Sequence, residues 1–236
     1  VAARWAPAVR SPDEVLVRVG RPGGIEPAEA ADLRAAGLLR RVLLDVHAPV
    51  DVPDTATLRA AAVACMLPRR LVDAGAVVAL TGAAWILASG EAPSRLDVVL
   101  PPDRNLPGGR ALRVHQMRLD RDDVTVRAAV RVTCPVRTLA DLARDRSVPV
   151  AELRRVAAVT GCRPEEVLAR LERLSGHRGV VRARRVVSGW ADGRRTGSVL
   201  VTAPHHPVGV EHAVHLADGG DDVAEVRRIG HLEGEP

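Results

Sequence analysis

RLDVVLPPDRNLPGGRALRVHQMRLDRDDVTVRAAVRVTCPVRTLADLARD, residues 95–145, is the stretch that decides the fold. Its apolar run at 96–100 stops at Pro101, which predicts a short buried strand. A turn rich in proline and glycine follows, and residues 112–119 predict a second strand. At 127–133, apolar and polar residues alternate with the period of a strand that has one solvent-exposed face. These patterns together predict a small sheet.

The spacing of apolar residues changes to that of a helix after residue 133. Thr133 is placed to cap this helix, with Pro135 in its first turn, where a missing N–H costs nothing. Arg137 and Asp141 lie four residues apart on one face, with Thr138 beside them. We expect the arginine and the aspartate to pair on an exposed or half-exposed side of the helix.

Two interpretations of these polar residues are open from the sequence. In the first, Asp141 bonds Arg137, and together with Thr138 they fix the junction between strand and helix. In the second, the same face joins Arg113 and His115 in a surface that contacts nucleic acid or a protein partner.

Composition limits the classes of function. The 236 residues are 47% apolar but only 1% aromatic, so the core must consist of Val, Leu and Ala, and base stacking on aromatic side chains is disfavoured. All 34 basic residues are arginine, which excludes a P-loop and any nuclease motif that needs lysine. The net charge of +5 permits a nucleic-acid partner. We found no G-x-S-x-G motif, and we predict no enzyme and no cofactor.

Three widely spaced cysteines form no disulfide framework, which indicates a cytoplasmic protein. No apolar run approaches the roughly 20 residues that span a bilayer, so we expect no membrane association.

The remaining elements follow from similar patterns. Asp54, Thr81, Thr133 and Ser147 are the predicted helix N-caps. The other predicted helices cover 28–36, 55–67, 82–89, a segment from 147 to Gly161, a segment from Pro164 to Gly176, and about 179–188; further strands are predicted at 38–48 and 77–80.

An arginine run lies in the last of these helices. Arg182, Arg184 and Arg185 form either a solvated face or a patch that contacts phosphates. After Gly189 the pattern weakens to two or three short strands at most. His212 and His215 would face opposite ways on a strand, so we predict no metal site there.

A specific order of motifs links this chain to a known family. The order resembles that of the AbiEi-type antitoxins of type IV toxin–antitoxin systems, and its pieces are Val98 to Pro101, Arg113-Val114-His115, Thr133, Pro135, Arg137-Thr138 and Asp141-Leu142-Ala143-Arg144. The resemblance implies a winged helix near the N-terminus and a nucleotidyltransferase toxin encoded nearby, which the antitoxin counters without a stable complex. In the high-GC bacterial branch, it also implies a C-terminal Vsr-like domain, whose pattern is missing or degenerate here.

We therefore predict an α/β (α+β) protein, with a small mixed sheet flanked by helices. Residues 1–52 are expected to form a partial winged-helix-like segment, 53–188 an AbiEi-like domain, and 189–236 a degenerate tail. The expected function is a non-catalytic transcriptional regulator that binds DNA at its own promoter; the alternative is the remnant of an antitoxin–endonuclease fusion that acts as a protein-interaction module. The candidate binding residues are Arg113, His115, Arg137, Thr138, Asp141, Arg182, Arg184 and Arg185.

Overall fold

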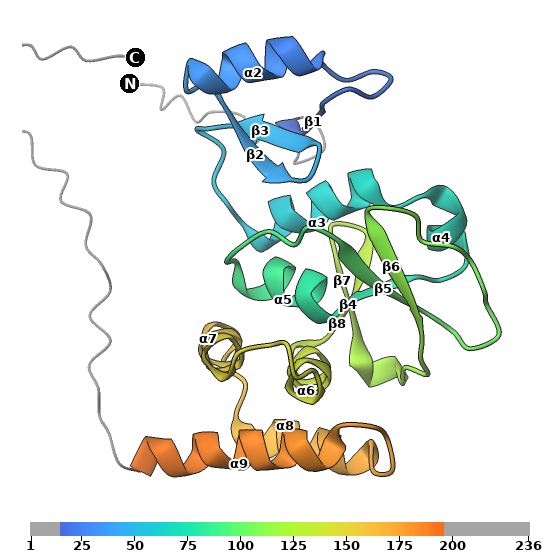
Figure 1. The fold of residues 1–236 in the computed structure, drawn as a ribbon, viewed down its shortest axis with the longest axis vertical. Coiled ribbons are helices and arrows are strands. Elements are labelled where there is room, and N and C mark those ends of the chain that lie inside the picture. The colour runs from blue at the N-terminus through green and yellow to red at the C-terminus, as the bar shows by residue number, and fades with distance from the viewer. Residues whose placement is uncertain (1–14, 196–236) are drawn as a thin grey trace, which may run out of the picture. The chain divides into compact units, whose positions relative to one another are not determined.

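The computed structural model describes residues 15–195 and contains a five-stranded mixed sheet (Figure 1). The strand order is β6-β5-β4-β8-β7, in which β5 pairs in parallel with β6, and β4 in parallel with β8, while the other neighbours are antiparallel. This mixed sheet and its helices confirm the predicted α/β class. The strands are β4 (Val77–Ala79), β5 (Leu96–Leu100), β6 (Leu112–Gln116), β7 (Val124–Arg127) and β8 (Val130–Thr133).

Strand β5 is where the sequence pattern and the structure agree most closely. It has the predicted bounds, and all five of its residues are buried. Leu96, Val98 and Leu100 pack into a core with residues of β4 and β8. Because side chains alternate along a strand, Asp97 points to the other face. A buried carboxylate therefore interrupts an otherwise apolar strand.

The single strand predicted at 127–133 is wrong, because residues 128 and 129 form the turn of a hairpin and only Val130–Thr133 make up its second arm, β8. The other arm, β7, starts directly after a short 3-10 helix, η1 (Arg121–Asp123). Ala128 and Ala129 make the turn with φ values of 41° and 61°. Two-residue hairpin turns need positive φ and favour Asn-Gly or Asp-Gly, so a turn made by two alanines gives no sequence signal.

The N-terminal part of the described chain holds helix α2 (Pro27–Ala35) and a three-stranded antiparallel sheet. The sheet comprises β1 (Val17–Arg18), β2 (Leu39–Leu43) and β3 (Val46–Pro49), in the order β1-β3-β2. The predicted single strand at 38–48 is thus wrong, because the chain reverses at Leu44, whose φ is 48°.

The remaining helices pack around two cores. The first core joins the larger sheet to α3 and the N-terminal sheet, and the second lies among α6, α7, α8 and α9. Helix α5 belongs to both, because Trp85 packs into the first core and Ala84 into the second. These helices are α3 (Ala56–Met66), α4 (Arg69–Asp73), α5 (Leu80–Ala88), α6 (Pro135–Arg144), α7 (Val150–Thr160), α8 (Pro164–Arg173) and α9 (Val180–Arg195).

Two further features complete the described fold. Helix α9 continues to Arg195, beyond the predicted end near Ser188, and the rest of the predicted tail lies outside the described residues. From residue 15 to residue 195, no helix is both long and apolar enough to cross a membrane.

The predicted N-caps are all wrong by one or two residues. Thr55 caps α3 in place of Asp54, and Cys134 and Pro149 take the N-cap positions of α6 and α7. The polar side chains predicted as caps bind elsewhere: Thr81 donates to Asp97, and Ser147 donates to Asp145. Thr81 thus makes a tertiary hydrogen bond, whereas Ser147 makes a local one within the loop before α7.

We predict that the second core contributes a large share of the stability. Leu139 of α6 is fully buried, so Leu139→Ala should lower the free energy of unfolding by about 2–5 kcal/mol. Val181 of α9 is 74% exposed, and Val181→Ala should change the free energy of unfolding by less than about 0.5 kcal/mol. Urea unfolding followed by circular dichroism measures both values. Equal losses in the two variants would contradict this assignment of the core.

Candidate functional site

The junction between β8 and α6 is held by two threonines. The Thr138 hydroxyl donates to the Thr133 carbonyl oxygen at 3.1 Å, and the two hydroxyl oxygens lie 2.7 Å apart. Both residues are fully buried. Thr133 therefore stabilises the junction from inside the fold rather than as the predicted N-cap, which is Cys134.

A buried ion network surrounds Arg137. Its Nη1 donates to Oδ2 of Asp123 and its Nε to Oδ2 of Asp141, each at 2.7 Å. Arg170 of α8 donates to the same oxygen of Asp123. All four side chains are at least 95% buried. The network therefore binds η1, α6 and α8 to one another.

Arg137 stays charged inside this network. Burial by itself would lower the pKa of its guanidinium, but attraction to Asp141 and then to Asp123 outweighs burial and raises the pKa above its ordinary value. A buried charge of this kind needs partners, and here two carboxylates supply them.

Arg137 and Asp141 pair as predicted. Their expected position on an exposed or half-exposed side of the helix is wrong, because both side chains are buried. Thr138 is buried with them. Their placement favours the structural interpretation of this motif over direct contact with a partner.

A second polar cluster forms on β5 and β6 around Asp97. This carboxylate accepts a hydrogen bond from Thr81 Oγ1 at 3.0 Å and lies 2.8 Å from Nε2 of His115. Nη1 of Arg113 is 3.7 Å from it. Arg113 is the register partner of Asp97 on β6, and His115 lies two residues further along, so the three share one face of the sheet.

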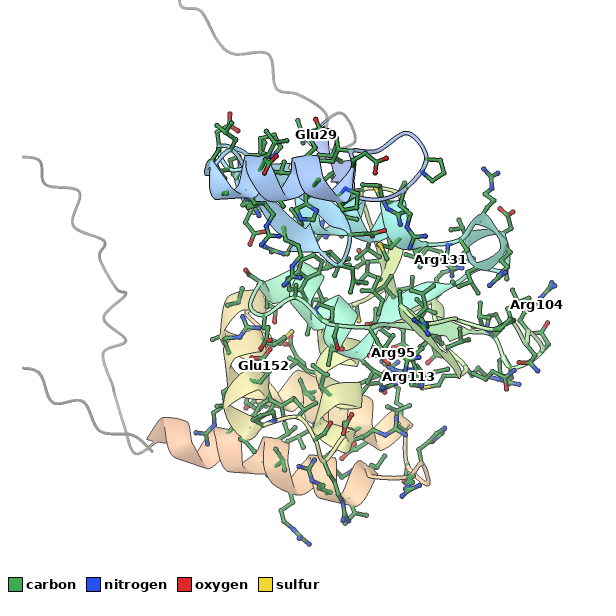
Figure 2. The ribbon with its side chains drawn as sticks, turned by 45° about the horizontal axis from the view of Figure 1, so that its top comes forward. Glu29, Arg95, Arg104, Arg113, Arg131 and Glu152 are labelled. Carbon is green, nitrogen blue, oxygen red and sulfur yellow. The ribbon has the colours of Figure 1, made fainter. Side chains whose placement is uncertain are left out.

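This cluster opens into a pocket of about 610 Å³. Its walls come from α5, the loop that precedes β5, the end of α6, the loop after α6 and the start of α7. Arg95, Arg113 and Glu152 are among the residues that line it (Figure 2).

Asp145, just after α6, connects this pocket to the arginines near α9. The Ser147 backbone N–H lowers the pKa of Asp145, against the effect of burial, and the Ser147 hydroxyl and the charges of Arg113 and Arg182 lower it further. Two neighbouring hollows continue from this point. Arginines of α6, its following loop, and α9 or the loop before it line them: Arg144, Arg146, Arg178 and Arg182.

The structure thus brings together Arg113, His115 and Arg182, which the sequence had placed in separate motifs. Arg182 also donates from Nη1 to the carbonyl oxygens of Ala143 and Asp145, which ties α9 to the end of α6. Of the remaining predicted residues, Arg184 is half-buried and Arg185 is exposed, and neither lines a pocket described above.

Sequence reasoning overlooked Asp97, Arg95 and Asp145 as members of this site. For Asp97 a signal existed, because a charged residue inside the apolar run LDVVL indicates a buried carboxylate with dedicated partners. Arg95 and Asp145 carried no such signal, since exposed charges beside a strand or after a helix are common.

Comparison with known proteins places the larger sheet and its helices in a family. The family model for the AbiEi antitoxin C-terminal domain matches the sequence at residues 76–188. Residues 76–188 are an AbiEi antitoxin C-terminal domain. The sequence resemblance is confirmed for this part of the chain, and the AbiEi domain contains β4 to β8, α5 to α8 and the first half of α9.

A solved structure is similar over a larger part of the chain. It is the crystal structure of the RV2827C protein from Mycobacterium tuberculosis, with a TM-score of 0.41 and 19% sequence identity. The match covers 74% of this chain and 71% of that chain. No curated protein matches the sequence.

Metal ligands are not grouped in the AbiEi domain or elsewhere between residues 15 and 195, where no three His, Cys, Asp or Glu side chains could hold an ion together. The histidines at 212 and 215 lie outside the described residues.

The buried network should be far more important for stability than a surface ion pair. Asp123→Ala leaves two buried guanidiniums without their shared partner, so it should lower the free energy of unfolding by about 3–5 kcal/mol. Asp73→Ala breaks the exposed Arg69–Asp73 pair, whose N–O distance is 3.0 Å, and should cost less than about 1 kcal/mol. Chemical unfolding of both variants is the measurement. Similar small losses would show that the network contributes little.

Proposed function

We propose that this protein is an antitoxin-like transcriptional regulator, cytoplasmic and non-catalytic, that binds DNA at its own promoter through arginine side chains. The observation that carries the proposal is the gathering of arginines around Asp145, on a domain of the AbiEi antitoxin family. Guanidinium groups keep their charge at any physiological pH and bind phosphate oxygens with two parallel hydrogen bonds.

The arginines divide into those that hold the fold and those that are free to bind. Arg137 and Arg170 are buried in ion pairs. Within the described chain, the guanidiniums of Arg146, Arg178 and Arg185 are exposed and have no hydrogen bond or ion pair. We infer that exposed arginines contact the phosphates, and that Arg137, Thr138 and Asp141 support that surface from within.

Arg113, His115 and Arg182 occupy an intermediate position in this proposal. Arg113 is 57% exposed and its one ion pair is long, so its donors remain available to a phosphate. Arg182 uses Nη1 for backbone carbonyls and keeps its other nitrogens for a ligand. His115 lies beside the same Asp97 carboxylate as Arg113, with its Nε2 2.8 Å from Oδ1, and so helps to position that carboxylate.

The family also suggests a partner. An antitoxin implies a cognate toxin, and the AbiEi resemblance implies a nucleotidyltransferase encoded nearby that is countered without a stable complex. We extend both expectations to this protein as part of the proposal.

Promoter binding should depend on arginines near α9. Changing Arg182, Arg184 and Arg185 to Ala should weaken retention of a promoter fragment, and the slope of log K against log salt should become shallower by about 0.9 for each phosphate that the variant no longer neutralises. A control with the same change in charge replaces Arg69, Arg70 and Arg104 with Ala, because these are exposed side chains away from this face.

Gel-shift titrations at several salt concentrations measure both variants. Equal affinity and salt slope in wild type and the α9 variant would make that patch ordinary solvated surface. Binding by the wild type of any duplex with no preference for its promoter would contradict the regulatory role.

The antitoxin role is tested in cells. Co-expression of this chain with a nucleotidyltransferase encoded beside its gene should restore growth that the toxin alone arrests, because the family implies neutralisation. Size-exclusion chromatography of the two purified proteins should show separate peaks. Growth arrest that persists at matched expression levels would contradict the antitoxin assignment, and a co-eluting complex would contradict neutralisation without stable association.

A further inference from the structure

The pocket beside Asp97 has unusual backbone at both ends of the helix that forms one of its walls. Leu80 and Ser89 flank the body of α5 and line the pocket, with φ values of 50° and 62°. Ser89 combines its φ with a ψ of −160°, a region that is essentially restricted to glycine. Such strain persists only where surrounding structure imposes it, and it concentrates at binding sites.

The carboxylates that line the pocket are already bonded. Asp97 accepts a hydrogen bond from Thr81 and lies within hydrogen-bond distance of His115. Both carboxylate oxygens of Glu152 accept hydrogen bonds from Arg155. Asp145 accepts from the backbone N–H and the hydroxyl of Ser147. These acids therefore have few oxygens left to attract a cation. Within the described chain the exceptions are Oδ2 of Asp145, since both bonds from Ser147 go to Oδ1, and Glu91, an exposed residue of the lining loop.

The hydrogen-bonding groups of the pocket that remain available to a ligand are mainly N–H donors. Arg113 reaches no closer than 3.7 Å to Asp97. Arg95 uses only Nη2, in two long hydrogen bonds of 3.4 and 3.3 Å to the carbonyl oxygens of Gly109 and Leu112. Both side chains are exposed, and Figure 2 shows them next to each other, apart from Glu152. Two adjacent guanidiniums whose N–H groups are mostly unused favour an anion.

The register of the strands explains why the two arginines meet. Arg95 lies directly before β5, and its Nη2 donates to the carbonyl oxygen of Leu112, the residue before Arg113 on β6. Arg113 pairs with Asp97 across β5 and β6. The buried Asp97 thus holds His115, and the two guanidiniums lie beside it at the mouth of the pocket.

We propose that this pocket binds a small phosphorylated molecule, with its phosphate between Arg95 and Arg113. A phosphate dianion balances two guanidiniums and matches their paired N–H groups. A volume of about 610 Å³ suits a ligand of mononucleotide size. The rest of the ligand would lie against the apolar part of the wall, which comprises Leu80, Ala84, Trp85, Leu142, Val148 and Pro149.

Calorimetric titration of the full chain with AMP, inorganic phosphate and adenosine tests the proposal. AMP should bind and raise the melting temperature, phosphate should compete with it, and adenosine should do neither, because the guanidiniums recognise the charged group. Arg95→Gln and Arg113→Gln should each weaken AMP binding by roughly tenfold or more, as expected for the loss of a charge-assisted hydrogen bond.

The matched control is Arg104→Gln, which makes the same change in charge at an exposed arginine outside this pocket and should leave AMP affinity unchanged. Circular dichroism of the ligand-free variants verifies folding, and Arg95→Gln alone suffices if Arg113→Gln does not fold. Absence of AMP binding at millimolar concentration, equal binding of adenosine, or unchanged affinity in both pocket variants would each overturn the proposal.

This inference does not rest on the proposed DNA binding, and the two fail separately. Arg95 is not among the proposed DNA contacts, so Arg95→Gln should lose AMP and retain the promoter. If the wild-type protein binds its promoter but not AMP, only the pocket proposal fails. If the wild-type protein binds AMP but not its promoter, only the DNA-binding proposal fails.

Discussion

One carboxylate, that of Asp123, joins the segment before β7 to helices α6 and α8. It accepts from Arg137 of α6 and Arg170 of α8, and its neighbour Asp120 accepts from Arg170 as well. Inside a protein such charges are stable only when each is satisfied, so the three elements that supply them have one common arrangement. Helix α6 ends at Arg144, directly before Asp145, and its position fixes where the face around Asp145 lies.

Arginine performs two distinct tasks in this fold. Some guanidiniums are buried and bind carboxylates or carbonyl oxygens, as Arg59 does with the Ile86 carbonyl, whereas others remain at the surface with free donors. A lysine could replace neither group well, because its single ammonium lacks the planar set of donors that reaches two partners at once. The absence of lysine from the whole sequence therefore costs this structure little. It also means that composition alone cannot separate structural from binding residues.

How far the sequence predicts this protein depends on where each side chain finds its partner. Strand β5 was predictable because its apolar run and its proline stop are local features. The hairpin turns at Leu44 and at Ala128 were not, because positive φ at these residues is imposed by the sheets rather than favoured by the residues themselves. The N-caps failed for a related reason, since Thr133 hydrogen-bonds the side chain of Thr138 instead of a helical N–H. The pairing of Arg137 with Asp141 was correctly predicted, but its burial depends on α8, which is distant in sequence.

The shared acceptor at Asp123 also restricts how this domain can change over evolutionary time. A substitution at this position removes the partner of two guanidiniums, so a single mutational step meets a steep barrier even if a wholly apolar trio would pack equally well. Positions 123, 137 and 170 therefore form an epistatic unit, whose members are expected to be replaced in concert or retained together. Exposed arginines without a bonded guanidinium, such as Arg146, Arg178 and Arg185, have no such coupling and are free to change one at a time, so the binding surface can diverge while the architecture beneath stays the same.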